Sequence, residues 1–135
     1  MTRAAPFGFR LDPRSGVPVY RQLIDQVQAG IASGNLVSGE QIPTVRQVAV
    51  DLEINPNTVL RAYRELEIRG VLDTQQGTGT FISDRKVTQD DAEHGRQLEQ
   101  LVSEFVARAG AGGFTVAELM DRLRERILEP EKRTK

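Results

Sequence analysis

Apolar residues recur at steps of three and four along five segments of this chain, which is the spacing of one face of a helix. The first segment covers residues 18–33 and is stopped by the pair Gly34-Asn35. Its apolar positions are Tyr20, Leu23, Ile24, Val27 and Ile31. Ahead of it, residues 1–17 carry prolines and glycines that oppose a helix, so we expect an extended N-terminal arm there.

The next two segments lie very close together. Thr44 and Gln47 have the spacing of a capping box, which predicts a short helix that runs to about Leu52. Only Glu53-Ile54 separates this helix from Asn55, where a third helix begins. Two helices joined by so tight a turn form a helix-turn-helix, in which the second helix projects into the major groove of DNA.

Both ends of the third helix are marked in the sequence. Asn55 is a good N-cap, and Pro56 suits the first helical position. Gly70 suits the left-handed position that closes a helix. The apolar face comprises Val59, Ala62, Tyr63 and Leu66. We interpret Tyr63 as a core residue with its hydroxyl at the rim, and a contact to a base is the alternative.

Two short extended segments follow the third helix. Residues 71–76 and 80–83 surround Gly77-Thr78-Gly79, which is the signal of a β-hairpin. A strand pair directly after the third helix is a wing. Residues 18–83 are therefore predicted to form a winged helix-turn-helix domain, and the fold class is mainly α with a small β-hairpin.

The remaining residues predict a C-terminal two-helix hairpin over residues 93–130, after a linker or helix start at 84–92 and before a tail at 131–135. The glycines at 110–113 separate its two helices, Thr115 caps the second one, and Pro130 ends it. About 40 residues cannot bury an apolar stripe alone. We expect the stripe to form a dimer interface; folding back on the winged domain is the alternative. Its residues are Leu98, Leu101, Val102, Phe105, Val106, Leu119 and Leu123.

Composition excludes several classes of site. The chain has no cysteine, which suits a reducing cytoplasm, and no apolar run long enough for a signal peptide or a membrane span. The single histidine, His94, cannot build a metal site, and we interpret Met120 as core filler. Neither paired carboxylates nor a phosphate-binding loop is apparent, so we expect no catalytic residue, no metal and no cofactor.

Net charge is −1, so a case for nucleic acid must rest on where the charges lie. The third helix opens with Asn57, Thr58 and Arg61 and carries no carboxylate until Glu65. Acidic residues normally gather in a first turn, whereas these side chains can donate to phosphates and base edges. An ordinary solvated helix face is the alternative. Arg46 likewise has an alternative as an ion-pair partner of Asp51 or Glu53.

Several separated motifs resemble the GntR family of bacterial transcription regulators. They are Pro18-Val19-Tyr20, the run from Gly39 to Arg46, Asn55 to Val59, Ala62-Tyr63, and Gly77 to Ile82. The Asn-Pro-Asn-Thr-Val form and the short C-terminal part resemble the YtrA subfamily. This resemblance implies a cytoplasmic, homodimeric regulator that binds operator DNA. Such regulators are usually repressors, often of transporter genes.

The resemblance also implies roles for single residues. Thr44 would meet a phosphate, and Arg46 would reach a phosphate or a base edge. Asn57, Thr58 and Arg61 would contact bases and backbone, and Gly79 would bring the wing close to the minor groove. Asn55 and Thr78, beside these residues, complete the candidate DNA-binding set.

The sequence also departs from the family's pattern. Leu60 stands where many members have arginine, and Gln75-Gln76 stand where wings are often basic. A small-molecule effector, insensitivity to effectors, and activation rather than repression all stay open. A winged helix used for protein–protein contact is the alternative function.

Overall fold

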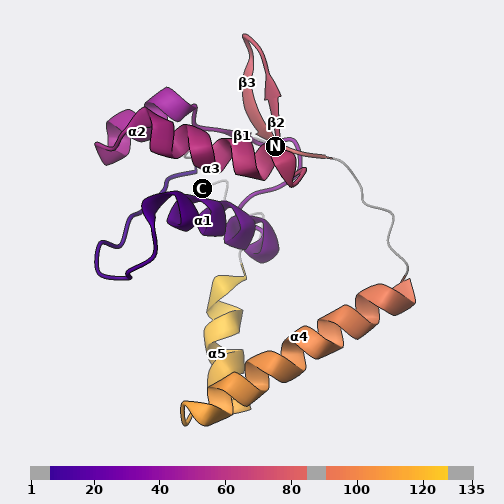
Figure 1. Cartoon of the computed structure of the whole chain (residues 1–135). Helices are drawn as coiled ribbons and strands as arrows, with labels where there is room; N and C mark the ends of the chain where they lie inside the picture. The colour runs from indigo at the N-terminus through magenta and orange to yellow at the C-terminus, as the bar shows by residue number, and fades with distance from the viewer. Residues whose placement is uncertain (1–6, 85–90, 128–135) are drawn as a thin grey trace. The chain divides into compact units, whose positions relative to one another are not determined.

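A computed structural model of the chain describes residues 7–84 and 91–127, which belong to two compact units. The first unit contains α1 (Val19–Ser33), β1 (Gln41–Ile42), α2 (Val45–Leu52), α3 (Pro56–Ile68), β2 (Leu72–Gln75) and β3 (Gly79–Ile82). The second unit contains α4 (Asp91–Ala111) and α5 (Val116–Arg126) (Figure 1). The predicted fold class, mainly helical with a small sheet, is confirmed.

The first unit is held together by a core to which every helix and strand contributes. α3 lies against both α1 and α2, because its apolar stripe is wide enough to face two neighbours. All four residues predicted for the buried face of α3 are buried. The other fully or nearly buried hydrophobic residues of this core are Phe7, Leu23, Ile24, Val27, Leu36, Ile42, Val48, Ala49, Leu72 and Ile82.

The sheet has one strand more than the predicted hairpin. β3 pairs with β2 in register Thr74↔Thr80 and with β1 in register Ile42↔Thr80, giving the antiparallel order β1-β3-β2. The added strand, β1, lies in the segment before α2, outside the predicted hairpin. This segment becomes a strand because it covers the free edge of β3 and buries Ile42. Pro43 follows directly and ends the pairing.

The N-terminal arm, where it is described, packs against α1. The side-chain amide of Gln22 accepts from Asp12 N (2.8 Å) and donates to Asp12 O (3.0 Å) and Val17 O (2.9 Å). Phe7 is only 6% exposed, because it enters the core beside α1. A Cβ on Gly30 would lie 3.3 Å from the Phe7 ring and 3.0 Å from Leu36, so glycine leaves the room that these side chains use. Ile31, expected to face the core, is 39% exposed.

The second unit is a helical hairpin with almost no interior. Thr115 and Glu118 form the predicted capping box at the start of α5. Among residues 91–127, only Ala109 is buried. Met120 is 43% exposed, so the interpretation as core filler is wrong for the hairpin by itself. The hairpin is too small to surround its own apolar side chains.

Four parts of the sequence-based prediction lie outside the described residues: residues 1–6 of the N-terminal arm, most of the linker at 84–92, Pro130 and the tail at 131–135. In the two described ranges, no helix combines the length and the apolarity that a bilayer crossing requires.

Candidate nucleic-acid interface

The start of α2 is closed by the predicted capping box. Thr44 Oγ1 accepts from Gln47 N at 3.1 Å, and Gln47 Oε1 accepts from Thr44 N at 2.8 Å. The first turn carries no acidic residue, so nothing opposes the positive end of the helix dipole. Arg46 projects from this turn, is exposed and, among the described residues, forms no ion pair with Asp51 or Glu53.

A rigid turn connects α2 to α3. Glu53 adopts the left-handed conformation (φ 56°), and Ile54 N donates back to Ala49 O at 3.0 Å. A non-glycine residue is held in this region only when its surroundings fix the backbone. Two residues after Glu53, Asn55 Oδ1 accepts from Asn57 N at 2.8 Å and caps α3 as predicted. The relative direction of the two helices is therefore fixed locally.

Tyr63 ties the middle of α3 to the residue before the α2 cap. Its hydroxyl donates to Pro43 O at 2.6 Å, and the side chain is buried. Burial raises the pKa of Tyr63, so the hydroxyl stays protonated and keeps this donor role. The interpretation of Tyr63 as a core residue is confirmed, because a hydroxyl bonded inside the domain is not presented to a base.

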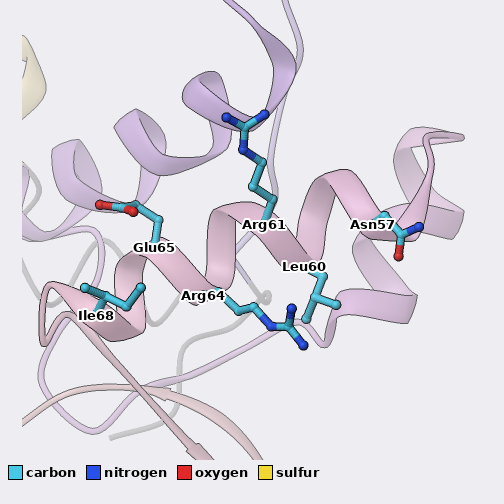
Figure 2. A pocket seen from close by; sticks show the side chains of 6 residues that line it. All are labelled: Asn57, Leu60, Arg61, Arg64, Glu65 and Ile68. Atoms are coloured by element: carbon cyan, nitrogen blue, oxygen red, sulfur yellow. The ribbon is translucent and has the colours of Figure 1, made fainter.

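The outward side of α3 is hollowed and is lined by both polar and apolar side chains. Figure 2 shows the side chains that line the hollow, and we call this surface the α3 face: Asn57, Leu60, Arg61, Arg64, Glu65 and Ile68. The structure thus brings Asn57 and Arg61 of the predicted set together. Thr58 does not line the hollow and is half-buried.

Arg64 is a candidate that the sequence analysis missed. It is exposed, lines the hollow, and forms no ion pair with any residue of the two described ranges. Seven residues, about two helical turns, separate it from Asn57, so both side chains lie on the same side of α3. That spacing was the signal in the sequence that points to Arg64.

Arg61 is held by α1. Its guanidinium carbon lies 3.7 Å from the centre of the Tyr20 ring, which is a cation–π contact. In Figure 2, Arg61 extends from one edge of the α3 face, whereas Leu60 and Arg64 extend from its other edge. Tyr20 covers one face of the guanidinium, whereas the N–H groups point outward in the plane and stay available.

The wing is a narrow hairpin that projects beyond the helices of its unit (Figure 1). At its tip, Thr78 N donates to Gln75 O at 2.9 Å. Thr78 is exposed, and its backbone O accepts from Gln41 Nε2 at 3.2 Å. Gly79 has φ 140°, which L-residues rarely adopt, so the turn itself requires glycine there. Gln75 and Gln76 leave the tip without charge.

Taken together, these features can bind a polyanion. The first turns of α2 and α3 carry no acidic residue, and Arg46 and Arg64 form no ion pair with any residue that the structure describes, which favours phosphate binding. Asn and Arg side chains can also pair with base edges. In the part of the chain that is described, no group of His, Cys, Asp or Glu could hold a metal ion. His94 lies exposed on α4.

Comparison with known proteins agrees with this geometry. A family model described as bacterial regulatory proteins, gntR family, matches residues 19–82, which span α1 to β3. The HTH-type transcriptional repressor YtrA of Bacillus subtilis (strain 168) is 32% identical over 116 residues, covering 86% of this chain and 89% of the relative. The chain belongs to the GntR family.

Two solved structures extend this likeness to nearly the whole chain. A transcriptional antiterminator from Listeria monocytogenes EGD-e has a TM-score of 0.65 at 27% identity and covers 90% of each chain. YtrA from Sulfolobus acidocaldarius, a GntR-family transcription factor, has a TM-score of 0.53 at 26% identity, covering 87% of this chain and 94% of that one. The GntR protein described here is therefore a winged-helix, DNA-binding transcription regulator of YtrA type, and not an enzyme.

Proposed function

We propose that the protein represses transcription by binding a palindromic operator as a homodimer, with α3 of each copy in the major groove. The observation that carries the proposal is the chemistry of the α3 face. Asn57, Arg61 and Arg64 offer donors there, and α3 holds no carboxylate before Glu65. Arginine pairs bidentately with guanine and asparagine with adenine, so this face can read a sequence.

Contacts to phosphate would fix how α3 enters the groove. Thr44 and Arg46 stand at the acid-free start of α2, and Asn55 stands at the start of α3. Such helix ends bind phosphate through backbone N–H groups and the dipole. Thr78 and Gly79 would place the wing backbone beside the minor groove. The uncharged tip predicts a wing contact that depends little on salt.

A second copy of the chain would cover the apolar face of the hairpin. Side chains on one stripe of α4 are strongly exposed, for example Leu101 at 64% and Phe105 at 44%. α5 adds Leu123 at 45% and the half-buried Leu119. A stripe of this length supports dimerisation, because monomeric proteins rarely expose contiguous apolar patches. The remaining members are Leu98, Val102 and Val106.

We infer the kind of gene that is regulated, and the direction of regulation, by analogy with the family. The B. subtilis relative is a repressor, and the resemblance to its subfamily favours transporter genes. A protein that binds operator DNA in a bacterium works in the cytoplasm. A small-molecule effector would act by changing the separation of the two α3 helices, because half-sites must lie about 34–36 Å apart.

The test is a selection of operator sequences from random duplexes, followed by affinity measurements at several salt concentrations. Arg64→Ala should weaken binding by roughly 5- to 150-fold and relax the preference at one base pair. Arg46→Ala should weaken binding to all duplexes alike and reduce the salt slope by about 1. Equal affinity of the unaltered protein for selected and random duplexes would overturn the proposal.

A matched control is available on the same helix. Arg69 pairs with Glu65 at 2.9 Å near the end of α3, far from the helix tip that enters the groove. Its exposed ion pair contributes only a few tenths of a kcal/mol to stability. Because Arg69→Ala leaves Glu65 of the α3 face without its partner, it should lower the affinity for all duplexes alike but keep the base preference of the unaltered protein.

A further inference from the structure

Leu60 is an apolar side chain that the fold does not use. It lies on α3 between the buried positions Val59 and Ala62, yet it does not belong to the hydrophobic core or to the partly buried residues packed against it. Instead it lines the hollow of the α3 face. Leu60 is half-buried, and the part of its side chain that lines the hollow would contact whatever group enters it.

The neighbours of Leu60 define what that partner offers. Asn57 precedes it by three residues and Arg64 follows it by four, so all three side chains lie on the same side of α3 (Figure 2). The two flanking residues donate hydrogen bonds, whereas Leu60 can only make dispersion contacts. Its partner is therefore an apolar group set between hydrogen-bond acceptors and negative charge.

One group in the major groove fits this description. Thymine alone presents a methyl group there, beside its own O4 acceptor and on the side of the base pair nearest its own sugar–phosphate strand. We propose that Leu60 recognises the 5-methyl group of a thymine in each operator half-site. This inference rests on the proposed function, in which α3 enters the major groove.

The other exposed apolar residue of the α3 face is placed less well for this role. Ile68 is 80% exposed, but it ends α3 and lies eight residues, about 12 Å, beyond Leu60. Recognition helices contact base edges with their N-terminal residues. Ile68 therefore serves as the matched control for an apolar side chain on the same face.

The experiment replaces single thymines by deoxyuridine, which removes only the methyl group. The unaltered protein first selects an operator from random duplexes, and each thymine of both half-sites is then replaced in turn. We expect one symmetric position to weaken binding roughly fourfold per half-site, the effect of one buried methyl group. In Leu60→Ala the same replacement should change affinity less than about 1.5-fold. Leu60→Met and Ile68→Ala should keep the penalty.

The outcomes separate this inference from the function on which it rests. A uridine penalty that is equal in the unaltered protein and in Leu60→Ala would overturn the role of Leu60, as would an operator in which no uridine matters. Failure of the unaltered protein to select any sequence would overturn both proposals. Thermal unfolding of the same samples should show unchanged stability in Leu60→Ala, because residue 60 lies outside the core.

Discussion

Arg61 of α3 stacks on Tyr20 of α1, with its guanidinium carbon 3.7 Å from the centre of the ring. Tyr20, at the beginning of α1, thereby restricts the conformation of the Arg61 side chain on α3. Because the stack fixes the guanidinium before DNA arrives, less conformational entropy is lost when its N–H groups bind.

Tyr20→Leu should lower operator affinity about two- to fivefold, the equivalent of a cation–π contact of about 0.5–1 kcal/mol. In an Arg61→Ala background the same change should have little effect, since nothing remains to be held. Tyr20→Phe keeps the ring and is the control. Binding titrations of the single and double variants give the coupling between them. Equal losses in both backgrounds would show that Tyr20 acts independently of Arg61.

Tyr63→Phe should destabilise the first unit by about 1 kcal/mol, because Pro43 O loses its donor. The pH dependence has a definite sign. The pKa of Tyr63 is raised above the ordinary value of 10.0, so the unfolded chain releases this proton first and stability falls above pH 10. Denaturant unfolding of both proteins should show their difference shrinking above that pH. A constant difference across the alkaline range would argue against the buried hydroxyl.

Phe105→Glu should dissociate the dimer, because it places a charge in the middle of the proposed apolar interface. Light scattering of the purified protein gives the oligomeric state. The control is Ala107→Glu, which puts the same charge on the opposite side of α4. If both variants stayed dimeric, or if both dissociated, the stripe on α4 would not be the interface.

Phe7→Ala should cost about 3–5 kcal/mol of stability, since a nearly buried aromatic side chain is lost from the core. Val17→Ala, in the same segment but 39% exposed, should change stability by less than about 1 kcal/mol. Thermal or urea unfolding measures both. A small loss from Phe7→Ala would mean that the N-terminal segment detaches without consequence for the fold.

Local signals in the sequence predict the helices well. Thr44, Asn55 and Gly70 determine where helices begin and end through contacts a few residues away, and the structure confirms all three. Asn57 and Arg61 were placed on the same helix tip for the same reason. Such features depend only on neighbouring backbone, so they can be read without the fold.

Contacts between distant segments could not be read in this way. Nothing near Arg61 in the sequence indicates that Tyr20, forty-one positions earlier, faces it. The pairing of Ile42 with Thr80 depends equally on how the chain folds back. Arg64 differs from these, because its spacing from Asn57 is visible in the sequence. Only its lack of an ion pair within residues 7–84 and 91–127 needed the structure.

The close approach of Phe7, Gly30 and Leu36 links the segment before α1 to the domain that the family model matches. The family match begins at residue 19, so Phe7 lies outside it although it completes the interior. Relatives that carry alanine or a larger residue where this chain has Gly30 should therefore compensate with smaller side chains at the positions of Phe7 or Leu36. The three positions are expected to vary together during evolution, and a hybrid that joins one member's leading segment to another member's helices should fold only when this trio is matched.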